Sequence, residues 1–393
     1  MHLHTRNINT AFRELVQFFK DGRDGKSETF FRGKNPVVRK PSRVGDVLMI
    51  EEPVTITYSH PRERVLFNAA RDANPFFHLY ESLWMLAGRR DIAPLAYYSS
   101  GYARQVQDGD CPDANGAYGH RWRHAYGGDD QQVPGDACPL VVDQLQLLIT
   151  HLKADPNSRR AVLQMWNVED DLLKVGSSRD VCCNTAVYFS LRMRDCVTTQ
   201  GWRKEGYNRE AWGYAPNNWS LDMTVTNRSN DLIWGTLGSD YVNLGFLQEY
   251  MAAHLGVEVG VYNQFSNNLH VYTERFKPEE WLKWCEDFCH DEYSTNGPQE
   301  SKAVFSLVKD PATFDRELPT FVEVHSNGDA AGKEPEAGWK EPFLKKVASP
   351  MLRAFHAYKK RGATKMSWTM RIAADDWRIA ATQWLERRIN REK

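Results

Sequence analysis

Residues 180–272 constrain the fold of this chain more than any other part of the sequence. Two strand-like runs, 186–194 and 221–227, are followed by a helical pattern over 241–255 and a third strand-like run over 257–265. The chain therefore mixes strands and helices without the regular strand–helix alternation that builds a parallel sheet. This order predicts an α+β fold.

The remaining segments fit the same class. Apolar spacing and turn residues predict two more helices, one loop and two more strands. These are an amphipathic helix over 5–20, a loop over 22–43, a strand over 47–58, a helix over 141–153 and a strand over 161–166.

One helix start is marked clearly in the sequence. Asn74 is followed by Pro75, and asparagine caps free N–H groups while proline is tolerated at the first helical position. The helix expected over 76–87 is apolar almost all round, which predicts burial. Glu81 lies inside this helix, and a buried carboxylate costs free energy unless it is paired.

The domain organisation follows from a change in composition. We expect a catalytic domain over residues 1–280 and a mostly helical extension over 281–393. Residues 198–219 are polar and rich in Trp and Tyr, which indicates an insertion in the first domain. Residues 323–342 are rich in Glu, Gly, Ala, Pro and Lys, which is typical of a linker.

Composition excludes several classes of partner. Lys and Arg (50) balance Asp and Glu (51), so no net field attracts nucleic acid or an anionic membrane. No apolar run reaches the roughly 18 residues of a membrane span. The first 12 residues are too polar for a secretory signal, and the seven cysteines are odd in number. We expect reduced thiols in a cytoplasmic protein.

The cysteines include a candidate nucleophile. Cys182 is favoured because a thiolate adds readily to an electron-poor carbon, although most cysteines are inert and buried. Its neighbour Cys183 should point to the other side of a strand, so the two are not expected to share a pocket. Cys285, Cys289 and His290 have helical spacing and lack a fourth ligand, so a helix face is favoured over a metal site.

Arginines with polar neighbours are candidates for phosphate binding. Arg228 precedes Ser229, and Arg159 precedes Arg160 just before an expected strand. A guanidinium group offers bidentate hydrogen bonds and a permanent charge. Most arginines are solvated surface groups, and the adjacent serine shifts the interpretation of Arg228 towards phosphate.

Three further residues could contact a base or a sugar. Asp240 begins a helix, where it is either an N-cap or a reader of the exocyclic amine of cytosine. His270 and Tyr272 lie two apart on an extended run and so point the same way. Their side chains either contact a sugar hydroxyl or fill the core.

Together these motifs resemble the thymidylate synthase superfamily, and within it the phage-type deoxycytidylate hydroxymethylases, over residues 43–276. The sequence Cys182-Cys183-Asn184-Thr185 is similar to the hydroxymethylases, since the synthases carry histidine after the cysteine. The resemblance implies a thymidylate synthase-like fold, a pyrimidine nucleoside monophosphate as substrate and an obligate homodimer. It assigns roles to residues as follows: Cys182 as the nucleophile, Glu81 and Tyr118 as catalytic residues, Arg228, Ser229 and Arg43 (with Arg39 as an alternative) as phosphate ligands, Arg159 and Arg160 as phosphate ligands of the partner subunit, Asp231 with Glu81 at the folate, and His270 and Tyr272 at the sugar 3′-hydroxyl.

The resemblance predicts from residue 240 whether the substrate base is cytosine or uracil. Counting back from Gly260 without gaps aligns Asp240 with one position of the family that this chain resembles. That position is asparagine in uracil-using synthases and aspartate in cytosine-using hydroxymethylases. A carboxylate facing the uracil carbonyl would be repelled, at a cost of about 1–3 kcal/mol. Asn243 is the rival if the preceding loop holds an insertion.

The resemblance implies conversion of dCMP to 5-hydroxymethyl-dCMP with 5,10-methylenetetrahydrofolate. Residues 387–393 are unlike the short apolar tail that seals the synthase folate pocket, which suits addition of water. Hydroxymethylation of CMP or dUMP and thymidylate synthesis are the alternatives. A cysteine hydrolase using Cys182 and His270 leaves the arginines unexplained, and a nucleic-acid binder is disfavoured by the neutral net charge.

Overall fold

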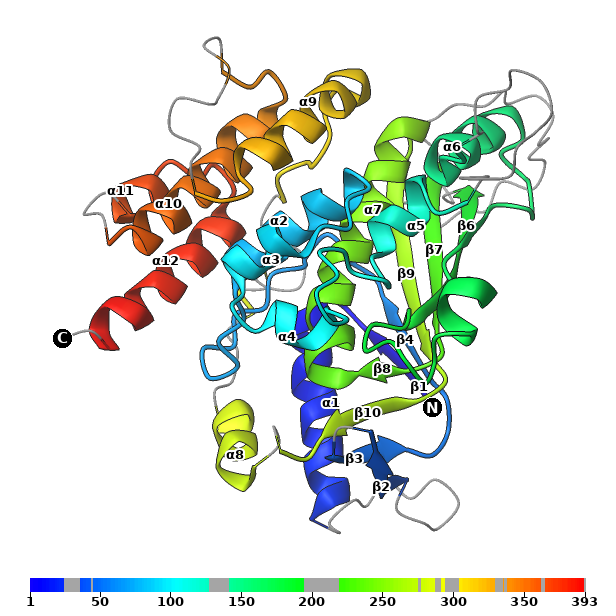
Figure 1. The fold of residues 1–393 in the computed structure, drawn as a ribbon, viewed down its shortest axis with the longest axis vertical. Helices are drawn as coiled ribbons and strands as arrows, with labels where there is room; N and C mark the ends of the chain where they lie inside the picture. Colours follow the sequence, from blue (N-terminus) through cyan, green and yellow to red (C-terminus); the bar gives the residue numbers. More distant parts are fainter. Residues whose placement is uncertain are drawn as a thin grey trace, which may run out of the picture.

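The fold is built from two sheets surrounded by helices (Figure 1). The computed structural model describes residues 1–24, 36–43, 45–126, 141–193, 219–274, 277–286, 291–293, 304–328, 335, 338–361 and 365–391. Its strands mix parallel and antiparallel pairs, and its helices do not alternate regularly with them. The predicted α+β class is confirmed.

The larger of the two sheets has six strands. Their order is β1 (His2–Thr5), β4 (Val54–Tyr58), β9 (Glu258–Ser266), β7 (Trp219–Asn227), β6 (Asn184–Met193) and β5 (Val162–Gln164). The smaller sheet has the order β2 (Val37–Ser42), β3 (Gly45–Ile50), β10 (Leu269–Tyr272) and β8 (Asn230–Asp231).

Two expectations for the N-terminal part are wrong. The single strand expected over 47–58 is two strands, β3 and β4, which belong to different sheets and are separated at 51–53. Pro53 has no N–H group to continue a ladder, so the alternating pattern conceals a break there. The loop expected over 22–43 contains strand β2, which pairs antiparallel with β3; residues 25–35 lie outside the described part.

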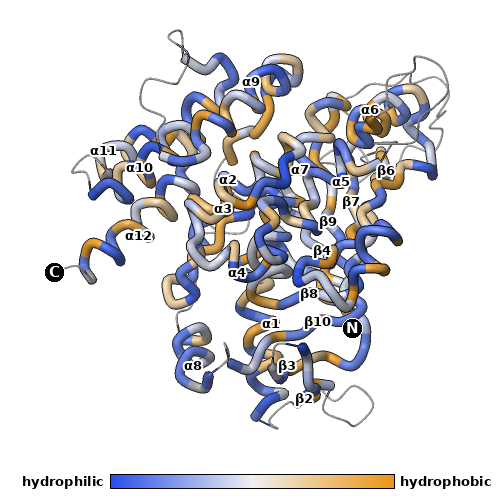
Figure 2. Tube along the Cα trace, in the orientation of Figure 1, coloured by the Kyte–Doolittle hydropathy of each residue, from blue (hydrophilic) through white to orange (hydrophobic). Residues whose placement is uncertain are grey.

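Helix α1 (Ile8–Arg23) is amphipathic, as its apolar spacing predicts. Asn7 caps it by accepting hydrogen bonds from the N–H groups of Asn9 and Thr10. Its buried face includes Phe12 and Phe19, and apolar and polar residues alternate along it (Figure 2).

Helix α2 (Pro75–Leu86) confirms the helix start at Asn74, whose side chain accepts from the N–H groups of Phe76 and Phe77. All of its residues except His78 are buried. It packs against α7 (Ser239–Leu255), so Glu81 lies beside the first turn of α7. This contact places one buried carboxylate next to a second acidic residue, Asp240.

The other helices surround this central pair. They are α3 (Ile92–Tyr98), α4 (Tyr102–Val106), α5 (Tyr118–Arg123), α6 (Gln144–Ala154), α8 (Pro278–Glu286), α9 (Pro311–Val324), α10 (Ser349–Lys359), α11 (Lys365–Thr369) and α12 (Asp375–Arg391), with π-helical turns η1 (Val168–Leu172), η3 (Leu232–Thr236) and η4 (Leu344–Ala348). No helix in the described ranges is long and apolar enough to cross a bilayer.

The C-terminal helices α9, α10 and α12 pack on α2 on the side away from the sheet (Figure 1). Tyr80 of α2 donates to the carbonyl of Val322 at 3.0 Å, and Phe76 packs on the rings of Phe355 and Trp384. Within the stretch expected to be a linker, Trp339 and Glu341 are buried. The expected insertion lies outside the described residues except for Trp219, as do Cys289 and His290.

Candidate active site

Two adjoining cavities lie between α2, the first turn of α7 and the residues that precede β6. Their volumes are about 140 Å³ and about 230 Å³. The residues that line both are Glu81, Tyr102, Tyr118, Cys183, Ser239 and Asp240. Asp180, Val181, Cys182 and Asn243 help to line the smaller cavity, whereas Asn230, Asp231 and Trp234 help to line the larger one. Five residues of the predicted site are therefore gathered around one space: Glu81, Tyr118, Cys182, Asp231 and Asp240.

Both adjacent cysteines line the smaller cavity, so the expectation that they cannot share a pocket is wrong. Cys182 and Cys183 precede strand β6, which begins at Asn184. The alternation of side chains holds only inside a strand. Cys183 also lines the larger cavity, while the Cys182 side chain belongs to the hydrophobic core and is 1% exposed.

The Arg228 guanidinium contacts the thiol of Cys183 and the backbone carbonyl of Cys182. Its Nε and Nη2 donate to the carbonyls of Cys182 and Val181, each at 2.8 Å, and Nη2 lies 3.8 Å from the Sγ atom of Cys183. Burial raises the pKa of the Cys183 thiol to about 11, against which the Arg228 charge lowers it. The arginine predicted to bind phosphate and the Cys183 thiol thus lie side by side.

The Cys182 thiol has a different environment. Burial raises its pKa well above the ordinary value, and the Asp171 carboxylate raises it further, although Arg121 lowers it. Cys182 also contributes its backbone: its N–H donates to Asp171 at 3.1 Å and its carbonyl accepts from Arg228. The geometry therefore favours Cys183 over Cys182 as the reacting thiol.

Glu81 has a partner, as its burial requires. Asn243 donates from Nδ2 to Glu81 Oε2 at 3.0 Å, and Ser82 donates to Asn243 Oδ1 at 2.7 Å. Burial raises the pKa of Glu81 to about 7, while hydrogen bonds from Asn243 and Ser239 lower it. Asn243 lines the smaller cavity, whereas Asp240 lines both cavities, so the two candidates for the base reader lie beside the same space.

Asp240 is the second residue of α7, whose N-cap is Gly238, so it is not the cap that its position suggested. Burial, and then the nearby Asp231, raise the pKa of its carboxyl to about 7. Gly235 makes this site possible: a Cβ atom there would lie 2.1 Å from Asn230 Oδ1 and 3.0 Å from Asp240 Oδ2. A side chain at 235 would push both polar groups away.

The raised pKa of Glu81 predicts a pH-dependent stability. A carboxyl whose folded pKa is about 7, against an ordinary 4.5, stabilises the fold fully below about 4.5, and this contribution is lost as pH rises through 7. For Glu81→Gln we expect the free energy of unfolding to fall less between pH 5 and pH 8 than in the wild type, by about 2.5 kcal/mol. Urea unfolding of both proteins without nucleotide measures this difference. If the free energy of unfolding changed with pH equally in the wild type and the variant, the prediction would be contradicted.

The two candidates for the phosphate-closing arginine differ in position. Arg43 donates to the carbonyls of Ser178 and Arg179, both at 3.1 Å, and so lies beside the residues that lead to the cysteines. Arg39 forms an ion pair with Asp46 at 3.3 Å, and its side chain is 61% exposed. The structure therefore favours Arg43 over Arg39. Ser229 follows Arg228 directly, at the end of β7.

The sugar and folate candidates meet on neighbouring strands of the smaller sheet. His270 and Tyr272 of β10 have ring centroids 5.3 Å apart, and His270 is in register with Asp231 of β8. Asp231 caps η3 through Oδ1. Its Oδ2 is buried and has no hydrogen-bond partner among the described residues. An unsatisfied acceptor beside the larger cavity fits a ligand that carries N–H donors, such as a pterin ring.

Arg159 and Arg160 are exposed in the turn before β5 and line neither cavity. Sequence reasoning missed Tyr102, Ser239 and Trp234 as lining residues. Tyr102 belongs to a short helix in a stretch without periodicity, and only its aromatic character could have drawn attention to it. Within the described ranges, no group of three or more His, Cys, Asp or Glu side chains could hold a metal ion.

Comparison with known proteins gives a consistent result. A family model described as "Thymidylate synthase" matches residues 67–283. A "Deoxyuridylate hydroxymethyltransferase" of Pseudomonas phage M6 is 36% identical over 397 residues, covering 98% of this chain and 94% of that protein. A protein with the same description from Bacillus phage SP01 is 35% identical over 57% of this chain and 50% of its own length. A "Putative thymidylate synthase" of Methanothermobacter thermautotrophicus is 30% identical over 49% of this chain and 69% of its own length.

The fold, the cavities lined by two thiols and four carboxyl groups, and these similarities agree. The chain belongs to the thymidylate synthase family and is a folate-dependent one-carbon transferase that acts on a pyrimidine nucleotide, with 5,10-methylenetetrahydrofolate as its co-substrate.

Proposed function

We propose that the protein is a deoxycytidylate 5-hydroxymethylase that converts dCMP to 5-hydroxymethyl-dCMP, with Cys183 rather than Cys182 as its nucleophile. The observation that carries the proposal is the group of side chains around the two cavities. A thiol beside a guanidinium, a buried Glu81 and an acid at position 240 share one space.

Each residue is assigned one task in the reaction. Arg228, Ser229 and Arg43 bind the phosphate, because Arg228 and Arg43 both bond to backbone carbonyls within residues 178–183. The thiolate of Cys183 adds to C6 of the ring, which makes C5 nucleophilic. The folate, held by Asp231 on the side of the larger cavity, supplies the methylene carbon that becomes bonded to C5.

The later steps need a proton carrier. Glu81, whose pKa of about 7 suits proton transfer near neutral pH, accepts the C5 proton through water. As the C5 proton leaves, the bond between the methylene carbon and the folate nitrogen breaks, and tetrahydrofolate departs with a proton on that nitrogen. Water then adds to the exocyclic methylene carbon: its oxygen becomes the hydroxyl group, and one of its protons is released. Cys183 leaves C6 as the 5,6-double bond reforms, which regenerates the free thiol. Tyr118 lines both cavities beside Cys183 and Asp240 and holds the base in this orientation.

The cytosine assignment rests on Asp240. An ionised carboxyl group accepts a hydrogen bond from the 4-amino group, and a neutral one both accepts from that amine and donates to ring N3. We assign the 4-position of the base to Asp240 because it lines both cavities, whereas Asn243 lines the smaller one and is hydrogen-bonded to Glu81 and Ser82. His270 and Tyr272 are assigned to the sugar 3′-hydroxyl, with deoxyribose preferred over ribose.

The alternative substrate is dUMP, which the descriptions of the two phage relatives favour. Because the pKa of Asp240 is raised to about 7, a neutral carboxyl group could also donate to uracil O4. The deciding experiment incubates the enzyme with methylenetetrahydrofolate and equal amounts of dCMP, dUMP and CMP. Mass spectrometry should show 5-hydroxymethyl-dCMP as the main product. Predominant modification of dUMP, or a methyl product with dihydrofolate, would refute the proposal.

A homodimer completes the proposed site. Arg159 and Arg160 are exposed next to β5, and no guanidinium bond joins either to a described residue. Beside them, the exposed apolar residues Val162 (39%) and Tyr188 (44%) are register partners on β5 and β6, which is typical of a subunit interface. We assign both arginines to the phosphate site of the partner subunit.

Sharing of the arginines predicts subunit complementation. An Arg159→Gln/Arg160→Gln protein and a Cys183→Ser protein should each be nearly inactive, yet unfolding and refolding them together should restore about a quarter of wild-type activity. Only the mixed dimer contains a site with its own Cys183 and the partner's arginines. The measurement is dCMP turnover after remixing, with each variant refolded alone as the control. Absence of recovery despite mixed dimers would contradict sharing.

A further inference from the structure

We infer that Asp171 and Arg121 form a positioning pair that holds residues 178–183, here called the cysteine segment, so that Cys183 meets Arg228. The inference rests on the proposed role of Cys183. It assigns a function to a buried ion pair outside the two cavities' shared lining.

The cysteine segment has no regular secondary structure, so no helix or ladder fixes its backbone. Side chains from elsewhere in the chain bond to it instead. The N–H of Arg179 donates to Asp108 at 2.8 Å, and Asn115 donates to the carbonyl of Asp180 at 2.9 Å. The N–H of Gly116 donates to the Asp180 carboxylate at 2.7 Å. The conformation of the cysteine segment therefore depends on polar contacts with residues that are distant in the sequence.

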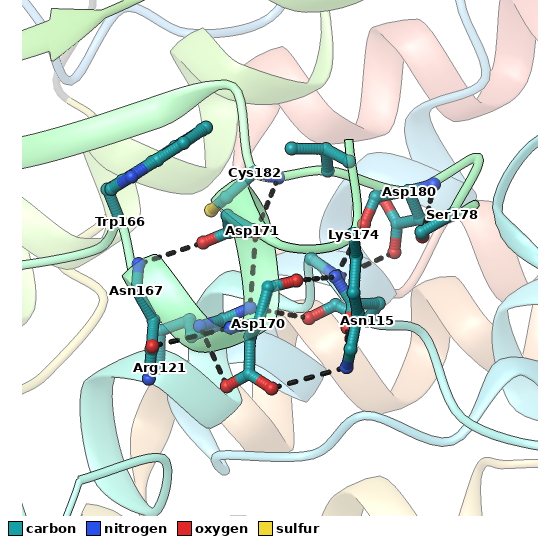
Figure 3. Close-up of polar contacts among 12 residues, drawn as sticks. Asn115, Arg121, Trp166, Asn167, Asp170, Asp171, Lys174, Ser178, Asp180 and Cys182 are labelled. Carbon is teal, nitrogen blue, oxygen red and sulfur yellow. Dashed lines mark hydrogen bonds and ion pairs between the residues drawn. The ribbon is translucent and has the colours of Figure 1, made fainter. Parts of the chain in front are cut away.

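Asp171 accepts a hydrogen bond from the backbone of Cys182, the residue before the proposed nucleophile (Figure 3). Its Oδ1 accepts from the N–H of Cys182 at 3.1 Å and from Arg121 Nη2 at 3.3 Å, and its Oδ2 accepts from the N–H of Asn167 at 2.9 Å. Asp171 is 0% exposed. A carboxylate buried to this extent needs a cationic partner, and Arg121, 2% exposed at its side chain, supplies it.

The peptide units around Cys182 are held from both sides. Asp171 accepts from the Cys182 N–H, while Arg228 donates to the Cys182 and Val181 carbonyls. The same guanidinium reaches the Cys183 sulfur at 3.8 Å. A shift of the Cys182 N–H away from Asp171 would therefore move the carbonyls that anchor Arg228, and with them the cation beside the Cys183 thiol.

The chain provides a matched control in the neighbouring acid. Asp170 also bonds to Arg121 at 3.3 Å, but its side chain is 41% exposed and pairs with Lys174 at 3.2 Å (Figure 3). Among the described residues, the Asp170 side chain bonds to Arg121 and Lys174 and not to the cysteine segment. Asp170→Asn and Asp171→Asn thus remove equal charge from the same arginine, and only the second disturbs the bond to Cys182.

The test compares these variants by two readouts at a temperature where circular dichroism shows both folded. Asp171→Asn should lower kcat on the order of tenfold, and should slow alkylation of Cys183 by iodoacetamide several-fold, with its pH profile moved to higher pH. Asp170→Asn should stay within about twofold of the wild type in both. Peptide mass spectrometry distinguishes alkylation at Cys183 from alkylation at Cys182.

The inference would be overturned if Asp170→Asn and Asp171→Asn had the same kcat and the same rate of Cys183 alkylation. It would also be overturned if Cys183 were alkylated at the wild-type rate in Asp171→Asn. If Asp171→Asn does not fold, the Arg121→Gln/Asp171→Asn variant, which leaves no buried charge alone, is measured with the same expectation. The alkylation readout needs no turnover. A wild-type enzyme inactive on every pyrimidine nucleotide would refute the proposed function, while the alkylation comparison would still decide this inference.

Discussion

Replacing Cys183 with serine is expected to lower dCMP turnover by a factor on the order of 10³ or more, because a hydroxyl is far less nucleophilic than a thiolate at neutral pH. Replacing Cys182 with serine should cost less than about tenfold. Cys182 contributes mainly its backbone N–H and carbonyl, and both survive the substitution. Arg228 lies 3.8 Å from the Cys183 sulfur and so stabilises the thiolate of that residue.

The two serine variants are controls for each other, since each replaces one sulfur atom by oxygen at neighbouring residues of the same segment. Steady-state kinetics with dCMP, together with circular dichroism to verify folding, measures the difference. If Cys182→Ser were the inactive protein and Cys183→Ser turned over normally, the nucleophile would be the residue first indicated by the sequence. Equal losses would point to a role of the whole segment.

Asp240→Asn is expected to change the preferred base. An amide can donate to uracil O4 while it accepts from uracil N3–H, and it removes the carboxylate that would be repelled by that carbonyl. We expect the ratio of kcat/KM for dCMP to that for dUMP to fall on the order of a hundredfold, equivalent to roughly 3 kcal/mol. Competition between the two nucleotides, read by mass spectrometry, measures the ratio directly.

Asp231→Asn is the matched control, because Asp231 also lines the larger cavity and is assigned to the folate. It should lower activity on both nucleotides and leave their ratio within about threefold. An unchanged ratio in Asp240→Asn would show that residue 240 does not face the 4-position of the base.

The elements that the sequence predicts well are those with strong local signals. The cap at Asn74, the apolar helix after it and the strands on either side of α7 follow from residue type and spacing. The strand expected over 47–58 failed because alternation continues across Pro53, where the chain changes sheets. The extent of β2 depends on pairing with β3, which local pattern does not reveal.

The site was predictable only in part. Glu81, Asp231 and Asp240 are brought to one space as the motifs suggested. The choice between Cys182 and Cys183 was not accessible, because strand alternation does not extend to the irregular segment before Asn184. Arg121 and Asp171 are 50 residues apart in sequence, and their pairing follows from the packing of α5 and η1 rather than from any local pattern.

The central claim is that Cys183 adds to C6 of a cytosine nucleotide. Incubation with 5-fluoro-dCMP and methylenetetrahydrofolate tests it most directly, because fluorine at C5 cannot leave as a proton does and the adduct is trapped. Peptide mass spectrometry should locate the nucleotide and folate masses on Cys183, in wild-type and Cys182→Ser proteins alike. An adduct on Cys182, or none under conditions where dCMP is turned over, would contradict the claim.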